Sequence, residues 1–409
     1  MPWCSAARMD DVVIAGGGPA GALAALILAR AGARVRVFER ARFPRHKLCG
    51  DTLNPGALAV LSRHLDTADL LASSDDIHGM LITGPGGVAV RATYGAGMTG
   101  RAVTRRVLDA WLLRQTCEAG AQVEEGVAVK GAQVASGRIH GITVARRGGG
   151  DARHDSRLVI AADGRRSTLA FARGLAHQPV RPRRWAIGGY FTGVAGCGAV
   201  GEMHVRKGHY IGIAPVPGGL TNVCVVMPHA AGDQPFGAPR DLMRRRLDAD
   251  PALRDRFTNA RAEGEPVMLG PMAVDSTAAG EPGLLLAGDA AGFIDPMTGD
   301  GLRLALAGAE LAAAVALEVL AGRLSPETAH LELTRRRQAA FAAKWRFNRT
   351  LRSLVTSPQG VSAAAVAARV VPSLFEAVIR YAGDCGQVPA DHLRRGYGGQ
   401  DAERGSRGV

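Results

Sequence analysis

Residues 11–21 of the chain read Asp-Val-Val-Ile-Ala-Gly-Gly-Gly-Pro-Ala-Gly. The run of apolar residues predicts a buried strand, and the glycines after it predict a tight turn into a helix. Gly16 permits the turn, Gly18 lets backbone amides come near a pyrophosphate, and Gly21 lets the helix pack closely on the strand. We therefore expect this stretch to bind the phosphates of a dinucleotide.

The residues that follow complete the same unit. Pro19 and Ala20 begin the expected helix, whose N-terminus carries a partial positive charge that faces the phosphates. Val35-Arg-Val-Phe-Glu39 predicts a second strand. Glu39 at its end, with Arg40 beside it, stands where an acid accepts hydrogen bonds from ribose hydroxyls. Strand, helix, strand and acid in this order indicate an ADP-containing cofactor, but they do not distinguish FAD from a nicotinamide.

The composition is that of a soluble globular enzyme. The chain has 409 residues, of which 47% are hydrophobic and 21% charged, and this length is enough for two or three cores. No apolar run is long enough to span a bilayer and the N-terminus lacks the order of a signal peptide, so we expect a cytoplasmic protein. The six cysteines form no Cys-x-x-Cys and no metal spacing, so we expect neither disulfides nor a bound metal.

The net charge of +13 invites a nucleic-acid interpretation, which we reject. Only four of the 50 basic residues are lysines, and the arginines are scattered along the chain except in its C-terminal third. The excess of arginine and alanine indicates a bias of composition rather than a binding face.

Beyond residue 39 the pattern departs from a single nucleotide-binding domain. The nucleotide-type elements come in separated pieces, with antiparallel strands between them. Expected helices cover residues 55–71, 104–119 (with Thr104 as N-cap), 241–257 and 302–320, and expected strands lie within 77–99, 123–144, 158–161, 186–227 and 284–287. A hairpin turn is expected over 146–155.

Two further motifs follow the glycine turn in order. They are Ala162-Asp-Gly-Arg-Arg-Ser167, and Ala287-Gly-Asp-Ala-Ala291 followed by Pro296-Met-Thr-Gly-Asp-Gly301. With the first turn they resemble the class A flavoprotein monooxygenase superfamily, whose archetype is p-hydroxybenzoate hydroxylase. Phe43-Pro-Arg-His-Lys-Leu-Cys-Gly-Asp51 and Gly292–Leu302 look most like its geranylgeranyl-reductase-related branch. No Trp-x-Trp-x-Ile-Pro occurs, which disfavours a halogenase.

The resemblance implies an α/β (α+β composite) fold, with a Rossmann-like FAD-binding domain, an inserted antiparallel-sheet substrate domain and C-terminal helices. We expect residues 1–9 to be a disordered tail. We assign 10–75, 100–175 and 271–325 to the FAD-binding domain, 76–99 and 176–270 to the substrate-binding sheet, and 326–409 to the helical region. The resemblance implies that the dinucleotide bound at the glycine motif is FAD. No second Gly-x-Gly-x-x-Gly occurs, so NAD(P)H is expected to bind only transiently, as a reductant.

The motifs also assign residues to the flavin. Asp289 follows a buried strand, where its carboxylate can accept from the ribityl hydroxyls, and Gly288 precedes it. The covering loop contributes Pro296, Gly299, Asp300 and Gly301, and the helix that begins near Leu302 directs its N-terminus at the flavin ring. The resemblance further implies an indirect role for Asp163 near the pyrophosphate and an FAD contact for Arg105; a solvated helix arginine is the alternative.

Catalytic candidates lie in the loop before Asp51 and on the inserted strands. Cys49 is expected beside the flavin, where His46 or Lys47 could lower the pKa of its thiol; a small packing residue is the alternative. His46 could instead orient a ligand or lie on the surface. Tyr210, with His204 and His209, could act as a general base for a phenol or could be structural.

Three functions stay open. The first is an NAD(P)H-dependent monooxygenase of specialised metabolism that hydroxylates an aromatic or polyketide-like small molecule through a flavin C4a-hydroperoxide, which we place first because hydroxylases dominate the wider superfamily. The second is a reductase of a prenyl or lipid-like double bond, which the motifs of the reductase branch favour. The third is a non-catalytic flavin-binding protein. We expect a monomer or a homodimer that binds no nucleic acid.

The C-terminal third carries one further feature. Residues 334–349 are basic and have aromatics at helical spacing. This stretch either packs on the flavin domain or lies on an anionic membrane surface, which would suit a lipid-like substrate.

Overall fold

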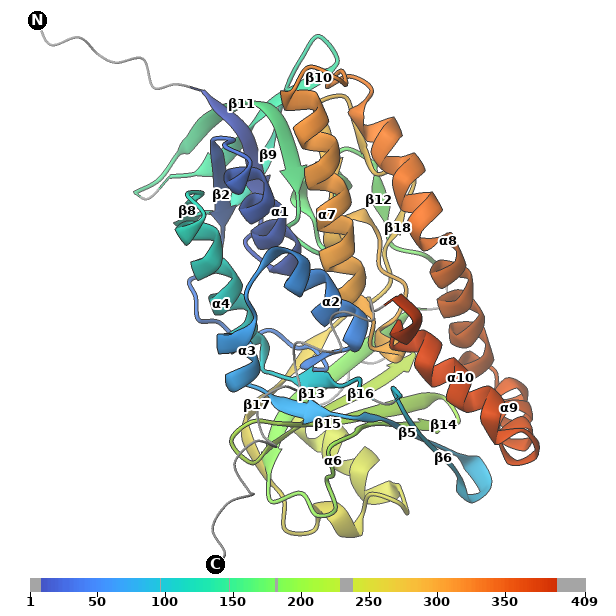
Figure 1. Cartoon of the computed structure of the whole chain (residues 1–409). Helices are drawn as coiled ribbons and strands as arrows, with labels where there is room; N and C mark the ends of the chain where they lie inside the picture. Colours follow the sequence, from blue (N-terminus) through green and yellow to red (C-terminus); the bar gives the residue numbers. More distant parts are fainter. Residues whose placement is uncertain (1–8, 96, 147, 181–182, 229–237, 388–409) are drawn as a thin grey trace, which may run out of the picture.

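The computed structural model describes residues 9–95, 97–146, 148–180, 183–228 and 238–387. Nearly all of the tail predicted for residues 1–9, and the end of the C-terminal region after residue 387, lie outside the described residues. The fold is mixed α/β, as predicted, with helices and two large sheets arranged one above the other (Figure 1).

The first unit of the fold is the one that residues 11–39 predict. β1 (Asp10–Ala15) leads into α1 (Pro19–Arg30) and then β2 (Val35–Glu39). β1 pairs in parallel with β2 on one side and with β11 (Asp151–Ala161) on the other. β1 lies between two strands, and its residues Val12 to Ala15 are fully buried. The strand therefore ends inside the protein, and the glycine turn opens from its end.

The upper sheet is largely parallel and carries helices on one face. Its order is β19 (Gly280–Glu281), β20 (Leu284–Leu286), β11, β1, β2 and β8 (Gln122–Glu125); β10 (Arg138–Ala145) and β9 (Val129–Ala135) continue antiparallel from β11. The helices α1, α2 (Pro55–His64), α4 (Arg105–Glu118) and α7 (Gly301–Leu320) share one buried apolar cluster with this sheet. The parallel strands thus end together at one edge.

The lower sheet joins two distant parts of the chain. Its order is β17 (Arg261–Leu269), β13 (Arg184–Thr192), β16 (Leu220–Pro228), β15 (His209–Val216), β14 (Gly201–Arg206), β5 (Gly79–Gly84) and β6 (Val88–Thr93). All neighbours are antiparallel except β14 and β5. Strands from the segments 76–99 and 176–270 therefore form one sheet, although the domain boundaries themselves stay predictions.

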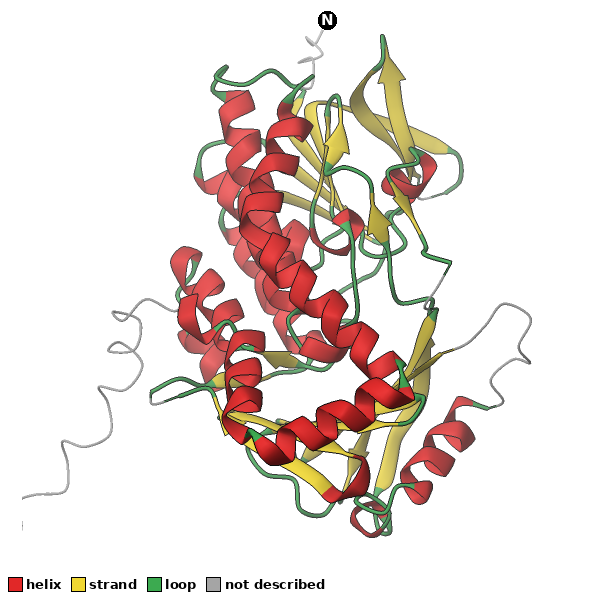
Figure 2. Ribbon diagram, turned by 90° about the vertical axis from the view of Figure 1, so that its right-hand side faces the viewer, coloured by secondary structure: helices red, strands yellow, loops and turns green. Residues whose placement is uncertain are grey.

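Smaller elements connect and cover the two sheets. They are the sheet of β3 (Thr52–Leu53), β7 (Gly100–Ala102) and β4 (Asp75–Ile77), the pair β12 (Ala176–His177) and β18 (Asp275–Ser276), helices α3 (Ala68–Ala72), α5 (Thr168–Ala172) and α6 (Pro239–Ala249), and the 3-10 turns η1 to η5 at Pro85–Gly87, Asp255–Phe257, Gly288–Ala291, Pro296–Thr298 and Cys385–Gln387. The C-terminal helices α8 (Ala329–Thr356), α9 (Pro358–Val370) and α10 (Pro372–Ala382) follow. Figure 2 shows the long helices running from one sheet to the other.

Three expected element boundaries are wrong. Residues 151–155 are not a turn but the start of β11, because their backbone pairs with Gly141–Ala145 of β10. The helix expected over 241–257 ends at Ala249, since Pro251 forces the residue before it into an extended conformation. The helix expected over 55–71 is divided into α2 and α3 at Leu65, which is extended.

Candidate functional site

The glycine turn has the geometry that its sequence predicts. Gly16 has a φ of +98°, and a Cβ atom there would lie 2.5 Å from the carbonyl oxygen of Ala162. A Cβ at Gly21 would lie 1.9 Å from the carbonyl oxygen of Gly16, so α1 can approach the turn only without a side chain there. No side chain caps the N-terminus of α1 at Gly18, and its free amides are therefore available to an anion.

Glu39 secures this turn from behind. Its carboxylate accepts hydrogen bonds from the backbone N–H of Gly17 at 2.8 Å and of Ala41 at 2.9 Å. A carboxylate can accept about four hydrogen bonds, so Glu39 can still accept one from a ribose hydroxyl, as predicted. Arg40, next to it, is exposed.

One large cavity begins at this turn and extends to the lower sheet. It encloses about 1730 Å³ including its open mouth. Of the residues predicted from the sequence, twelve line it: Gly18, Pro19, Ala20, Cys49, Arg105, Tyr210, Gly288, Asp289, Pro296, Gly299, Gly301 and Leu302. We call this the main cavity. Three motifs far apart in the chain thus meet around a single space.

The other predicted residues lie outside the cavity wall. Gly16, Gly21 and Glu39 support the turn as described above, and His46 and Arg40 are exposed. Asp163 accepts a hydrogen bond from the backbone N–H of Thr168 at 2.7 Å, so it holds the turn after β11; burial raises the pKa of this carboxyl. These positions agree with an indirect role for Asp163 and give no support to a catalytic role for His46.

Asp300 is turned away from the main cavity. Its carboxylate accepts hydrogen bonds from Thr298 Oγ1 at 2.6 Å and from Asn348 Nδ2 at 2.9 Å, and Lys344 Nζ lies 3.6 Å away. Asn348 and Lys344 belong to α8, so Asp300 fixes the covering loop to the C-terminal helix. From the sequence we assigned Asp300 to the flavin-covering loop, and these contacts fit a positioning role for its side chain.

Arg105 is a buried cation at the cavity wall. Its Nε and Nη2 donate to the two oxygens of Asp109 at 2.7 and 2.8 Å, and Arg45 Nη1 lies 3.2 Å from the same carboxylate. Burial by itself would lower the pKa of Arg105, but Asp109 and the Cys49 thiol raise it well above its usual range. The guanidinium is therefore charged at any ordinary pH and suits an anionic group in the cavity.

Two residues that the sequence analysis did not select, Asn222 and Tyr190, help to hold the Cys49 loop. Asn222 Nδ2 donates to the carbonyl oxygen of Cys49 and to Asp51 Oδ2, both at 2.8 Å. Tyr190 donates to the same Asp51 oxygen at 2.5 Å, and Arg105 N donates to Asp51 Oδ1 at 3.0 Å. The sequence did contain a signal for Asn222, because it is a polar residue among the apolar residues of a strand.

Asp51 is unusual in two ways. It has a φ of +52°, and its side chain is fully buried. Burial raises the pKa of its carboxyl to about 6, although the three hydrogen bonds act in the opposite direction. Strained backbone and a perturbed carboxyl beside a cavity are typical of functional sites.

The far wall of the cavity is mostly apolar and comes from the lower sheet. Met203, Val226, Leu269 and Met272 contribute to it. Tyr210 also faces this wall, but its hydroxyl donates to Asp295 Oδ1 at 2.6 Å. Burial, and then the charge of Asp295, raise the pKa of Tyr210 well above its usual range, so the phenol keeps its proton.

The two candidate histidines do not line the main cavity. His204 is buried between Thr83 Oγ1 and Glu202 Oε2, each 2.8 Å from a ring nitrogen. His209 lies at the start of β15, and burial and then Arg246 lower the pKa of its ring. The structural alternative therefore fits both.

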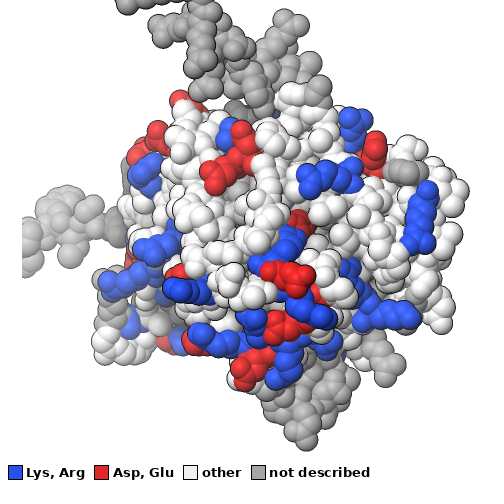
Figure 3. Space-filling model, turned by 90° about the horizontal axis from the view of Figure 1, so that it is seen from below, with Lys and Arg blue, Asp and Glu red and all other residues white. Residues whose placement is uncertain are grey.

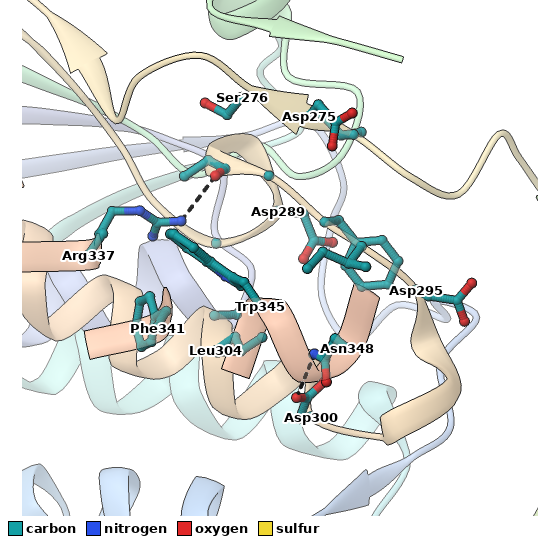
Figure 4. Close-up of a pocket in the computed structure, with 18 of the residues that line it drawn as sticks. Asp275, Ser276, Asp289, Asp295, Asp300, Leu304, Arg337, Phe341, Trp345 and Asn348 are labelled. Carbon is teal, nitrogen blue, oxygen red and sulfur yellow. Dashed lines mark hydrogen bonds between the residues drawn. The ribbon is translucent and has the colours of Figure 1, made fainter. Parts of the chain in front are cut away.

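A second, smaller cavity of about 730 Å³ lies behind Asp289. Figure 4 shows it between the loop that carries Asp289 and Asp295 and the α8 side chains Arg337 and Trp345. Arg337 Nη2 donates to the carbonyl oxygen of Ala291 at 3.0 Å, and burial lowers the pKa of this guanidinium to about 10. α8 thus supports the Gly288–Asp289 turn from the side opposite the main cavity.

The residues present fit a bound FAD. The main cavity offers free helix amides at Gly18, the cation of Arg105 and the carboxylate of Asp289 along its length. These are the groups that a pyrophosphate, an anionic flavin edge and ribityl hydroxyls require.

Comparison with known proteins decides the family. A family model described as an FAD binding domain matches residues 9–347. The chain belongs to this FAD-binding family. It is 29% identical to digeranylgeranylglycerophospholipid reductase 1 of Methanopyrus kandleri over 76% of this chain and 81% of that protein. It is 31% identical to menaquinone reductase of Mycolicibacterium smegmatis over 74% and 75% of the two chains.

Solved structures agree on the fold. The flavin-dependent brominase Bmp2 superposes with a TM-score of 0.80 and 21% identity over 94% of this chain and 97% of that one; this likeness concerns the fold alone. The FAD-binding protein is therefore a member of the class A flavoprotein monooxygenase superfamily related to the geranylgeranyl reductases, and it is an FAD-dependent oxidoreductase. This result excludes the non-catalytic alternative.

Proposed function

We propose that this FAD-dependent enzyme is a reductase that saturates a carbon–carbon double bond in a long, apolar, isoprenoid-like substrate. The observation that carries the proposal is the continuity of the main cavity, which joins the flavin motifs at Gly18 and Asp289 to the apolar wall of Met203, Leu269 and Met272. The two reductases at about 30% identity support it, because the name of the first refers to a geranylgeranyl lipid.

Each part of the cavity has a task in this proposal. The apolar wall binds the hydrocarbon chain and excludes water, since burial of apolar surface is favourable. Arg105 balances negative charge at the cofactor end. Bound FAD, once reduced by NAD(P)H as is typical of this family, would supply the hydride for the double bond.

Cys49 is the residue to which we assign the accompanying proton. Its thiol lies near Arg105, and Asn222 fixes its backbone at 2.8 Å. A thiol held at the cavity wall can hold a proton at Sγ and release it to a neighbouring carbon. His46 is exposed and Tyr210 is already bound to Asp295, so both are weaker candidates.

Hydroxylation of an aromatic or polyketide-like substrate is the second candidate. The pair Tyr210–Asp295 favours it, because it places a polar group in a mostly apolar wall, where a phenol could bind.

Anaerobic turnover separates the two candidates. The holoenzyme would be incubated with NAD(P)H and either menaquinone or a digeranylgeranyl phospholipid, and the products analysed by mass spectrometry. A product whose isoprenoid chain has gained two hydrogens without oxygen, as located by fragmentation, supports the reductase. A product that forms only in air and has gained one oxygen would overturn it in favour of hydroxylation.

A further inference from the structure

Apolar side chains gather on the outside of the corner between α9 and α10. Val366 is 61% exposed, Val370 73%, Val371 45% and Leu374 54%. The inner sides of the same helices are anchored, since Ala368 and Phe375 pack on the hairpin of β5 and β6. The outer residues therefore form an unpartnered apolar surface, which we call the corner patch (Val366, Val370, Val371 and Leu374).

The corner does not have the form of a membrane span. Within the described part of the chain, no single helix is long and apolar enough to cross a bilayer. The segments Gln359–Val370 and Ser373–Ala382 pass such a test only as a pair, and they are bent by 115° at the break between them. A bent, half-anchored pair of this kind fits a bilayer surface, where an apolar face enters the headgroup region.

The helices of the corner carry a net positive charge. Arg346, Arg349, Arg369 and Arg380 are exposed on α8, α9 and α10. From residue 345 to residue 382 the sequence contains one acid, Glu376. Figure 3 views the molecule from below and shows broad uncharged areas with separate basic side chains toward the right, the side on which Figure 1 places α9.

The segment that the sequence analysis selected for membrane contact, residues 334–349, is partly engaged by the protein itself. Arg335 and Arg336 pair with Glu332, at 2.7 and 2.6 Å, and Arg337 and Lys344 are buried. Part of the basic stretch 334–349 therefore packs or pairs within the protein, while Arg346 and Arg349 at its end stay exposed. We therefore place the membrane contact at the corner that follows it.

Two occupants could cover the corner patch, a second copy of the chain or a lipid bilayer, and the positive charge of the surrounding helices distinguishes them. A second copy of the chain would bring the same positive surface against itself, which is unfavourable. An anionic bilayer attracts nearby arginines and accepts the exposed valines and leucine at the same time.

We propose that the corner patch docks on an anionic lipid surface. In a second step, α10 connects this surface to the active site, because its residues Ile379 and Ala382 line the main cavity. Docking there places the cavity next to the bilayer, so that an apolar substrate passes into it without crossing water. The docking step stands by itself, whereas the transfer step rests on the proposed function.

Vesicle flotation tests the docking step with the full-length holoenzyme. Vesicles of phosphatidylcholine with phosphatidylglycerol are compared with phosphatidylcholine alone. We expect the protein to float with the anionic vesicles and Val370→Glu/Leu374→Glu to reduce the bound fraction about tenfold or more, while Arg369→Gln/Arg380→Gln has a similar effect at low salt. Flavin absorbance and thermal unfolding confirm that each variant is folded.

The matched control is Val134→Glu/Val267→Glu, because these valines are 44% and 48% exposed on β9 and β17, away from the corner. It should bind vesicles as the unmodified protein does. Absence of binding, equal binding to neutral vesicles, or an equal loss in Val370→Glu/Leu374→Glu and in the control Val134→Glu/Val267→Glu would overturn the proposal. So would a dimer, seen without vesicles, that Val370→Glu/Leu374→Glu disrupts.

Turnover separates a failure of docking from a failure of the proposed function. Menaquinone is offered in anionic vesicles or dispersed in detergent. We expect the corner variant to slow only the vesicle reaction, about tenfold, which supports transfer from the bilayer. If both reactions slow equally, the transfer step is wrong. If the unmodified enzyme reduces menaquinone in neither form, the proposed function and the transfer step fail for this substrate, and the flotation result stands unaffected.

Discussion

Arg105 and Asp109 form a doubly hydrogen-bonded ion pair one turn apart on α4, with N–O distances of 2.7 and 2.8 Å and almost no exposure to solvent. The pair fixes a positive charge at the wall of the main cavity. Because breaking a buried ion pair leaves one charge unpaired, its loss costs far more than the loss of a surface pair.

We therefore expect Asp109→Asn to destabilise the protein by about 3–5 kcal/mol and to weaken flavin binding about tenfold. Chemical denaturation and titration of the apoprotein with FAD measure the two effects. Glu118→Gln is the matched control, since it removes an i,i+4 partner of Arg114 on the same helix, with both side chains more than half exposed. An equal effect of the two substitutions would contradict this account.

The second prediction concerns the glycine turn. Gly21→Ala places a Cβ atom 1.9 Å from the carbonyl oxygen of Gly16, so the backbone must move where the phosphates are expected to bind. We expect a loss of about 1–3 kcal/mol or more in stability and a protein that is purified without flavin. Gly131→Ala, which meets no atom within 4 Å, should retain its flavin. Full flavin content in Gly21→Ala would place the cofactor elsewhere.

The third prediction is a pH dependence of stability. Burial raises the pKa of Asp51 to about 6 from its usual 3.8, so the folded state holds a proton that the unfolded state has already released between these values. The contribution of Asp51 to the free energy of unfolding is therefore fully present below about pH 4, and it is lost as the pH rises toward 6. The total change is about 3 kcal/mol.

Asp51→Asn removes this slope, because an amide does not titrate. Denaturation curves of both proteins from pH 4 to pH 8 measure the difference, which should grow toward pH 6 and then stay constant. A constant difference across the whole range would mean that Asp51 titrates normally in the folded protein.

The fourth prediction separates chemistry from packing at Cys49. If its thiol supplies the proton, Cys49→Ser should lower kcat about tenfold or more, equal to about 1.4 kcal/mol in the barrier, with little change in KM. Cys117→Ser on the exposed side of α4 is the control and should keep full activity. Full activity in Cys49→Ser would exclude a chemical role and leave Cys49 as a packing residue.

The sequence by itself determined the flavin half of the site. The turn at Gly16, the helix that begins at Pro19 and the Gly288–Asp289 turn are local structures, set by φ angles and by the absence of a Cβ atom, and such constraints can be read from neighbouring residues. The residues of three motifs could be named from their order alone, and twelve of the nineteen predicted residues line one cavity.

Only the tertiary structure decided what surrounds the substrate. Asn222 and Cys49 are 173 residues apart, and they meet because β16 lies within the lower sheet and faces the loop after β2. The orientation of Asp300 toward Asn348, and the burial of Arg337 and Lys344 within the basic stretch, likewise follow from how α8 packs. Long-range packing selects one partner among many chemically equal ones, and a local pattern carries no information about that choice.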